Sequence, residues 1–279
     1  MTAVTDHTWF LTFWGFLIAL GVVEYARAID PAAASRKVRW PVNIGFGVVN
    51  GLVASALPIS TVAAASWAQS RGIGLLNTLA LPAAIAVVAT VLFRTLAQYG
   101  LHRLAHAWPP LWSVHRVHHC DTCLDGSTGL RFHPLELLVS MAVLVPLSIA
   151  MGLSPVALAA LETVEILGGI LTHTSLRLPE PAERALRPYI VTPALHRLHH
   201  SDHRQETDSN YGALLVIWDR LFGTYLAESK RAPEVFRTGL DTVAPDDASN
   251  LGWLLAGTLR KEAARNSSKG ASNVDNSNA

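Results

Sequence analysis

The sequence predicts an all-α integral membrane protein in which four to five membrane-embedded helices support a cytoplasmic helical cap that carries a cluster of histidines. Three observations lead to this prediction. Half of the 279 residues are hydrophobic and only 15% are charged, and the charge-free runs are long enough for membrane-spanning helices. A short basic loop follows the first of these runs, which is typical of a cytoplasmic loop. Eleven of the twelve histidines lie between positions 102 and 203, several of them at helical spacing.

The first two predicted spans flank the basic loop. Residues 9–23 are apolar and uncharged and, with their flanks, are just long enough for one crossing of about 20 residues. Four basic residues follow within a short loop: Arg27, Arg36, Lys37 and Arg39. The excess of positive charge indicates that this loop lies in the cytoplasm. Residues 40–70 contain no charged residue and predict a second span, which ends at a weakly charged turn on the other side.

A third span is predicted at residues 72–93, and its helix should continue past Arg94 and carry two histidines out of the lipid on the cytoplasmic side. The sequence Trp-Pro-Pro at 108–110 would end that helix, and residues 111–119 predict a short helix after it. A helical hairpin is predicted at residues 137–171. Its arms are short for a full crossing, and the hairpin returns the chain to the side that it left.

The expected division of the chain is a membrane domain at 1–228 with its histidine core at 94–228, a partly helical extension at 229–263 and a disordered tail at 264–279. The tail is rich in Asn and Ser and has too few apolar groups to offset its ordering entropy. The net charge of +1 gives no reason to expect a nucleic-acid partner. Cys120 and Cys123 form a lone CxxC, which we interpret as reduced thiols because a zinc ribbon would need a second pair.

The histidines form blocks whose spacing places them on helix faces. His102 and His106 are four residues apart and share one face of a helix. Residues 115–119 read HRVHH and residues 196–200 read HRLHH, so the same HxxHH spacing occurs twice. Imidazole suits iron, zinc and copper, and the two blocks supply more imidazoles than a four-coordinate zinc can use. A two-metal centre is therefore the simplest interpretation.

An HxxxH pair followed by two HxxHH blocks resembles the sterol desaturase / fatty acid hydroxylase superfamily of integral-membrane, non-haem di-iron oxygenases. Further segments are similar to that family over residues 10–228, in order: DGSTGLRFHPLE, THTSLRLP, HHSDHRQETDSNYG and WDRLFGTY. Two features depart from the family pattern. The helix before the first block carries Arg94, Thr95, Gln98 and Tyr99 where an acidic residue is common. Arg177 stands where related hydroxylases have a second histidine, and a guanidinium is not a metal ligand.

The resemblance implies a ligand set drawn from the histidines of these segments: His102, His106, His115, His118, His119, His173, His196, His199 and His200. His133 and His203 are further candidates, either as ligands or as hydrogen-bond partners of ligands. Metal-bound histidines need oriented acceptors for their second nitrogen, and Asp121, Asp125 and Asp208 are candidates for that role. No catalytic residue is expected beyond the metal ligands.

The function implied by the resemblance is that of an O2-dependent oxidoreductase with two iron ions, an Fe–Fe centre, that hydroxylates or desaturates a lipid C–H bond in lipid biosynthesis. O2 would be the co-substrate, and an external reductase or carrier protein would supply the electrons. We expect a multi-pass protein of the inner or plasma membrane with its histidine site on the cytoplasmic face. The lipid substrate would enter from the bilayer between helices.

Two sets of residues inside the membrane bear on this hypothesis. Glu162 and Glu165 lie in the hairpin, where carboxylates are costly and usually face the protein interior. We expect them either to pair helices or to act in the site. Trp14, Phe93 and Trp112 are expected to line the path of the substrate.

Two other classes of function remain open for a histidine-rich membrane chain. A zinc-dependent membrane hydrolase is one, although the sequence has no HExxH and has more histidines than zinc needs. A non-enzymatic metal-binding or transport protein is the other. Its metal-binding residues should lie within the spans, whereas these histidines are expected at one membrane face.

Overall fold

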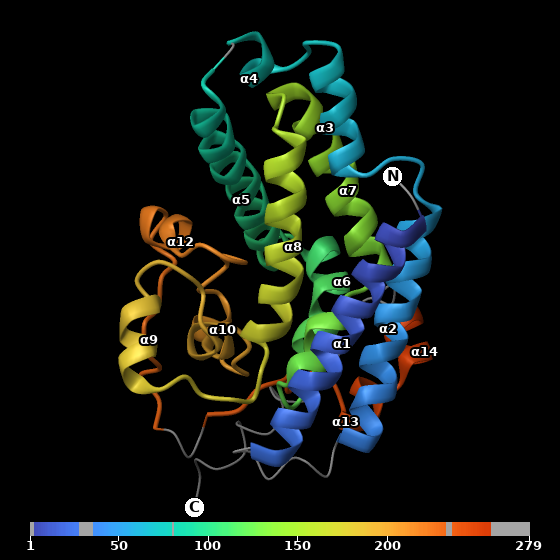
Figure 1. Cartoon of the computed structure of the whole chain (residues 1–279). Coiled ribbons are helices and arrows are strands. Elements are labelled where there is room, and N and C mark those ends of the chain that lie inside the picture. The colour runs from blue at the N-terminus through green and yellow to red at the C-terminus, as the bar shows by residue number, and fades with distance from the viewer. Residues whose placement is uncertain (1–2, 28–35, 80, 233–235, 258–279) are drawn as a thin grey trace, which may run out of the picture.

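The computed structural model describes residues 3–27, 36–79, 81–232 and 236–257, and these residues form helices and loops with isolated β-bridges but no strand. Long helices make up the body, and short helices lie at both ends of it (Figure 1). The predicted all-α architecture is confirmed. Four helical segments among the described residues are long and apolar enough to cross a membrane: Arg36–Thr78, Ala83–Ala107, Pro134–Met151 and Pro155–Thr172.

The long helices follow the apolar runs of the sequence. Their bounds are α1 Ala3–Arg27, α2 Arg36–Ala56, α5 Ala83–Ala107, α7 Pro134–Met151 and α8 Pro155–Thr172. Helices α5 and α8 contact each other, and α7 packs against α2 and α5. Many large apolar side chains on these helices are exposed, as expected for surfaces that face lipid.

Two predicted spans are not single helices. The run 40–70 is divided, because α2 ends at Ala56 and α3 (Thr61–Ser70) begins after Pro58. The run 72–93 is likewise divided between α4 (Leu75–Thr78) and α5, with Pro82 directly before α5. Proline has no backbone N–H and disfavours helical geometry in the residue before it, so each of these helices stops near a proline.

The predicted hairpin is confirmed by α7 and α8, which are joined by a tight turn at Gly152. Gly152 has a φ of 63°, in the left-handed region that glycine tolerates. A Cβ at this position would lie 2.8 Å from the Asn77 side chain, so a larger residue would also clash.

The predicted break at Trp108-Pro109-Pro110 is confirmed and folds the chain back on itself. Helix α5 ends at Ala107, and α6 (Pro109–His119) begins with a proline in its first turn, where the missing N–H has no helical partner. Helices α5 and α6 pack against each other. This arrangement brings the HxxxH pair of α5 to the first HxxHH block on α6.

The cap consists of short helices at the end of the body that carries the histidines (Figure 1). They are α9 Glu180–Leu186, α10 Pro193–His199, α11 Arg204–Thr207 and α12 Ile217–Leu221. Helix α10 contacts α8, which places the second HxxHH block against the membrane helices. The extension contains α13 (Pro245–Ala248) and α14 (Leu251–Gly257), and α14 packs on α2. The predicted tail at 264–279 lies outside the described residues.

Candidate metal centre

Nine histidines converge from four helices at the junction of the body and the cap. They form two adjoining groups, in each of which one nitrogen per ring lies within 4.8 Å of the others. The first group is His102, His106, His115, His119 and His199, and the second is His118, His173, His196 and His200. These are the nine histidines predicted as the main ligand candidates.

Each HxxHH block contributes to both groups, which follows from helix geometry. His115 and His119 are four residues apart on α6 and enter the first group, while His118 points to the second. On α10 the division is reversed, since His196 and His200 enter the second group. The rings of His119 and His200 stack at a centroid distance of 4.4 Å, so the two groups share a boundary.

Six of the histidine rings are oriented by a hydrogen bond from Nδ1–H to a backbone carbonyl or to a carboxylate. Nδ1–H of His118 donates to the Arg131 carbonyl at 3.2 Å, and that of His199 donates to the Ser209 carbonyl at 2.7 Å. Nδ1–H of His102 donates to the Tyr211 carbonyl, and that of His173 donates to the Gly169 carbonyl. Carboxylates accept the other two bonds, Asp208 from His106 and Glu136 from His115. A neutral ring that donates from Nδ1 leaves a lone pair on Nε2.

The freed Nε2 lone pairs face one another. Nε2 of His118 lies 3.0 Å from Nε2 of His173, and Nε2 of His102 lies 3.1 Å from Nε2 of His115. Lone pairs at this distance repel unless a cation lies among them. Two ligands about 2.1 Å from one ion are about 3.0 Å apart when the angle at the ion is roughly 90°, whereas tetrahedral zinc needs about 3.4 Å. The clustered nitrogens therefore fit a metal ion shared by several imidazoles.

Burial keeps these rings neutral. The pKa is well below 6.5 for His118, His119, His196 and His200, about 4 for His173 and about 3 for His199, chiefly because burial penalises the charged form. The neutral ring is the form that binds a metal, so the fold holds the histidines ready to act as ligands near neutral pH.

The lowered pKa values predict that the metal-free protein loses stability on acidification. The unfolded state takes up protons on these histidines below about pH 6.5, whereas the folded state resists them down to the lowered pKa. Through His173 alone, the free energy of unfolding should be lower by about 2 kcal/mol at pH 5 than at pH 8. Thermal unfolding of metal-free protein in detergent should show a melting temperature that falls steadily below pH 6.5. A flat profile between pH 7.5 and pH 5 would contradict the prediction.

Two candidate histidines lie outside both groups. His133 caps the start of α7, where Nδ1 accepts from the Leu135 N–H and Nε2 donates to the Leu255 carbonyl at 3.3 Å. His203 is exposed at the start of α11. The structure thus gives His133 a structural role and brings neither residue to the clustered nitrogens.

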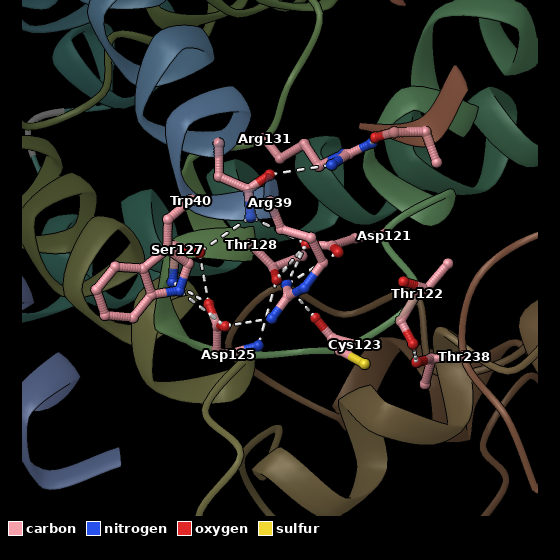
Figure 2. Close-up of polar contacts among 12 residues, drawn as sticks. Arg39, Trp40, Asp121, Thr122, Cys123, Asp125, Ser127, Thr128, Arg131 and Thr238 are labelled. Carbon is pink, nitrogen blue, oxygen red and sulfur yellow. Dashed lines mark hydrogen bonds and ion pairs between the residues drawn. The ribbon is translucent and has the colours of Figure 1, made fainter. Parts of the chain in front are cut away.

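Asp208 accepts a hydrogen bond from a clustered histidine, as predicted. The same prediction is wrong for Asp121 and Asp125. Asp121 and Asp125 instead form ion pairs with Arg39 of α2, at 2.9 Å and 2.6 Å (Figure 2). All three side chains are at least 95% buried. Burial alone would raise the pKa of Asp121, but the charges of Arg39 and Arg131 together with hydrogen bonds from Asn43 and Thr128 lower it below its usual value. This Arg39 network ties α2 to the loop that follows the first HxxHH block.

Arg131 extends the network to the end of α6. It is fully buried, and its guanidinium donates to the Val117 carbonyl, to Asn43 Oδ1 at 3.0 Å and to Cys120 Sγ. Its backbone carbonyl also accepts the hydrogen bond from His118. Arg131 therefore satisfies one of the last carbonyls of α6, that of Val117, and orients one histidine of the second group. The two cysteines lie beside this network without a disulfide, as expected.

A cavity of about 510 Å³ lies between the long helices and reaches both histidine groups. His102, His115, His118, His173 and His196 line one end of it, and apolar residues of α5 to α8 line much of the rest. This volume is typical of a site for a small molecule or part of a lipid.

The three residues expected along the path of the substrate do not line this cavity. Trp14, Phe93 and Trp112 are absent from the lining, which includes Phe13 and Phe132 instead. One step along a helix turns a side chain by about 100°, so Phe13 and Trp14 face different neighbours. Phe93 packs against the core formed by α3, α4 and α8.

Several contacts that orient the histidines were not predicted from the sequence. Glu136, which orients His115, lies within the segment FHPLE, and its place in the first turn of an apolar helix three residues after a histidine was an available signal. The carbonyls of Gly169, Tyr211 and Ser209 gave no signal, because an acceptor on the backbone does not depend on residue type.

Fold and site together define a membrane protein with paired histidine clusters at one end of its long helices. Residues 87–224 match the family described as fatty acid hydroxylase, so the histidine-bearing part of the chain is similar to that family. The match agrees with the resemblance inferred from the two HxxHH blocks. No solved structure matches the chain.

Among its curated relatives, the chain is 36% identical to ornithine lipid hydroxylase OlsE of Rhizobium tropici over 145 residues, which are 52% of this chain and 43% of that protein. It is 32% identical to alkylglycerol monooxygenase of Homo sapiens over 148 residues, or 53% of this chain and 32% of that one. Methylsterol monooxygenase 1-3 of Arabidopsis thaliana is 23% identical over 235 residues, 78% and 77% of the two chains. The match thus spans less than half the length of the first two relatives.

Proposed function

We propose that this protein is an O2-dependent membrane oxidoreductase that inserts oxygen into, or removes hydrogen from, a C–H bond of a lipid. The observation that carries the proposal is the convergence of nine neutral imidazoles in two adjoining groups at the end of a cavity between membrane helices. The relatives support it, since their names are those of lipid hydroxylases and monooxygenases.

The residues fit two iron ions, one for each group. Five histidines would hold one ion and four the other, and imidazole suits iron. When bound, the pair would supply the activation of O2 and the attack on an unactivated C–H bond. The first group exceeds the four ligands of a tetrahedral zinc site, which argues against the hydrolase alternative.

The chain's own residues position the substrate and the ligands. Asp208 and Glu136 hold the rings of His106 and His115 by accepting their Nδ1–H groups, at 3.2 Å and 2.8 Å. Such partners also increase the basicity of the ligating nitrogen. Leu101, Val114 and Ile170 line the cavity and are adjacent to histidines or near them, and their apolar side chains would exclude water from that end. An apolar chain from the bilayer fits this lining.

Metal analysis and O2 uptake test the proposal directly. We expect two iron ions per purified chain and O2 uptake that depends on a reductant and on membrane lipid, with an external carrier protein as the electron donor. His203→Ala is the matched control, since this exposed histidine lies outside both groups. Zinc alone, retained after expression in iron-rich medium and without O2 uptake, would refute the proposal.

The histidine site is proposed to face the cytoplasm of the inner or plasma membrane. Lys37 is exposed at the start of α2, and Arg39 in the same turn pairs with Asp121 just after α6, so this basic segment lies at the histidine end. Short basic segments remain on the cytoplasmic side.

Cysteine labelling checks this orientation. Single cysteines replace Ser70 at the end of α3 and Glu180 on α9, both exposed, in a background with Cys120→Ser and Cys123→Ser. An impermeant maleimide should label Ser70→Cys in intact cells and Glu180→Cys only after lysis. Labelling of both from outside would contradict the proposed orientation.

A further inference from the structure

A charged cluster lines the cavity between the candidate membrane helices α5 and α8, away from the histidines. Arg94 of α5 forms an ion pair with Glu165 of α8 at 3.1 Å, and its Nε forms a longer ion pair with Oε1 of Glu162 at 3.9 Å, beyond hydrogen-bond distance. Thr61 donates a hydrogen bond to Glu162, and Gln98 accepts one from Arg94. Charged groups in a membrane are costly and usually serve a function.

Two atoms of the cluster have no hydrogen-bond partner among the described residues. They are Nε of Arg94 and Oε1 of Glu165, and both are buried. Both residues line the cavity, and Arg94 is only 6% exposed. One of these atoms is a donor and the other is an acceptor. A hydroxyl group can accept from the first and donate to the second, whereas an ammonium cannot accept and a carboxylate cannot donate.

The charged cluster and the histidines lie at two different heights along α5 and α8, and the same separation is found on both helices. Arg94 precedes His102 by eight residues on α5, and Glu165 precedes His173 by eight residues along α8 and its C-cap. Both helices run from the far end of the body toward the histidines (Figure 1). Eight residues of helix correspond to about 12 Å. Between the levels, Leu101, Ile166 and Gly169 line the cavity.

We propose that the cavity binds a lipid with a hydroxyl group, which bridges Arg94 and Glu165, and that the chain or ring system extends from there to the histidines. The carbon that reaches the histidines then lies about 12 Å from the hydroxyl oxygen, or roughly ten bonds along an extended chain. That this carbon is the one oxidised rests on the proposed function. The binding itself does not.

Photolabelling tests the binding without metal, O2 or turnover. The probe is a long-chain primary alcohol with a diazirine roughly ten bonds from its hydroxyl, and the control probe is the hydrocarbon of equal length without the hydroxyl. In wild-type protein the alcohol should label α6, around Leu111 and Val114, which line the cavity at the histidine level. The hydrocarbon should label the lining without a preferred position, because nothing anchors its end.

Two variants sharpen the test. Glu165→Gln keeps the size of the side chain but removes the charged acceptor, and should reduce labelling of α6 by the alcohol about tenfold while leaving the hydrocarbon unchanged. Glu180→Gln on exposed α9 is the matched control. Gly169→Leu should block labelling of α6 by both probes. A Cβ at Gly169 meets no atom within 4 Å, so the new side chain starts in open space, and Gly169 itself lines the cavity.

Equal labelling of α6 by the alcohol and the hydrocarbon in wild-type protein would overturn the proposal, whatever the variants do. The cluster would then only pair α5 with α8 or hold water. Iron content and O2 uptake are measured separately. If the alcohol labels α6 as expected but iron and O2 uptake are both absent, the oxygenase function is refuted and the hydroxyl site is still supported.

Discussion

Replacing His119 or His200 with alanine should each reduce oxygenation by more than about 100-fold and remove bound iron, although the two residues are far apart in sequence. His119 belongs to the group of five histidines and His200 to the group of four, and their rings stack at 4.4 Å. Loss of a partner that merely orients a ligand already costs about 10–100-fold, so loss of a ligand should cost more. We expect each variant to disturb both iron ions, because each HxxHH block serves both groups.

Iron per chain and product formation in the two single variants decide this prediction. His203→Ala provides the control, since it removes an exposed imidazole of the same cap. Folding should survive in all three variants, because lipid and helix packing hold the spans. Full iron and normal turnover in His200→Ala beside an inactive His119→Ala would show that the two blocks act independently.

Replacing Arg39 with leucine should destabilise the protein by about 3–5 kcal/mol, the usual cost of leaving buried charges without a partner. Both carboxylates that it pairs with, Asp121 and Asp125, are almost completely buried. Asp121 keeps the bonds from Asn43 and Thr128, but neither is charged. The loop after α6 should loosen, and iron binding should weaken with it.

Unfolding of Arg39→Leu and wild type in detergent measures the effect. Arg184→Leu is the matched control, because Arg184 pairs with Glu180 at 3.3 Å but both side chains are largely exposed, at 65% and 72%. Exposed pairs contribute about 0–1 kcal/mol. The triple variant Arg39→Leu, Asp121→Asn, Asp125→Asn should recover part of the lost stability. Equal stability of Arg39→Leu and Arg184→Leu would show that the buried pairs contribute no more than a surface pair.

The chain order of the elements could be predicted because it depends on local properties. Charge-free runs placed the long helices, and the Trp-Pro-Pro sequence placed the reversal between α5 and α6. Pro58 and Pro82 carried the same information, and their effect on the runs at 40–70 and 72–93 was not anticipated. The arrangement within an HxxHH block is local as well, since its first and last histidines lie about one helical turn apart.

What the sequence by itself determined was therefore the membrane class, the helices and the nine clustered histidines, because hydrophobicity and helical periodicity act over a few residues. Only the tertiary structure decided which histidines share a group, since His199 joins His102 across 97 positions through the packing of α10 against the body. It also decided that Asp121 and Asp125 serve Arg39, and that backbone carbonyls orient several rings. Such contacts depend on how distant helices pack. Every residue has a backbone carbonyl, so the sequence does not indicate which carbonyl accepts a bond from a histidine.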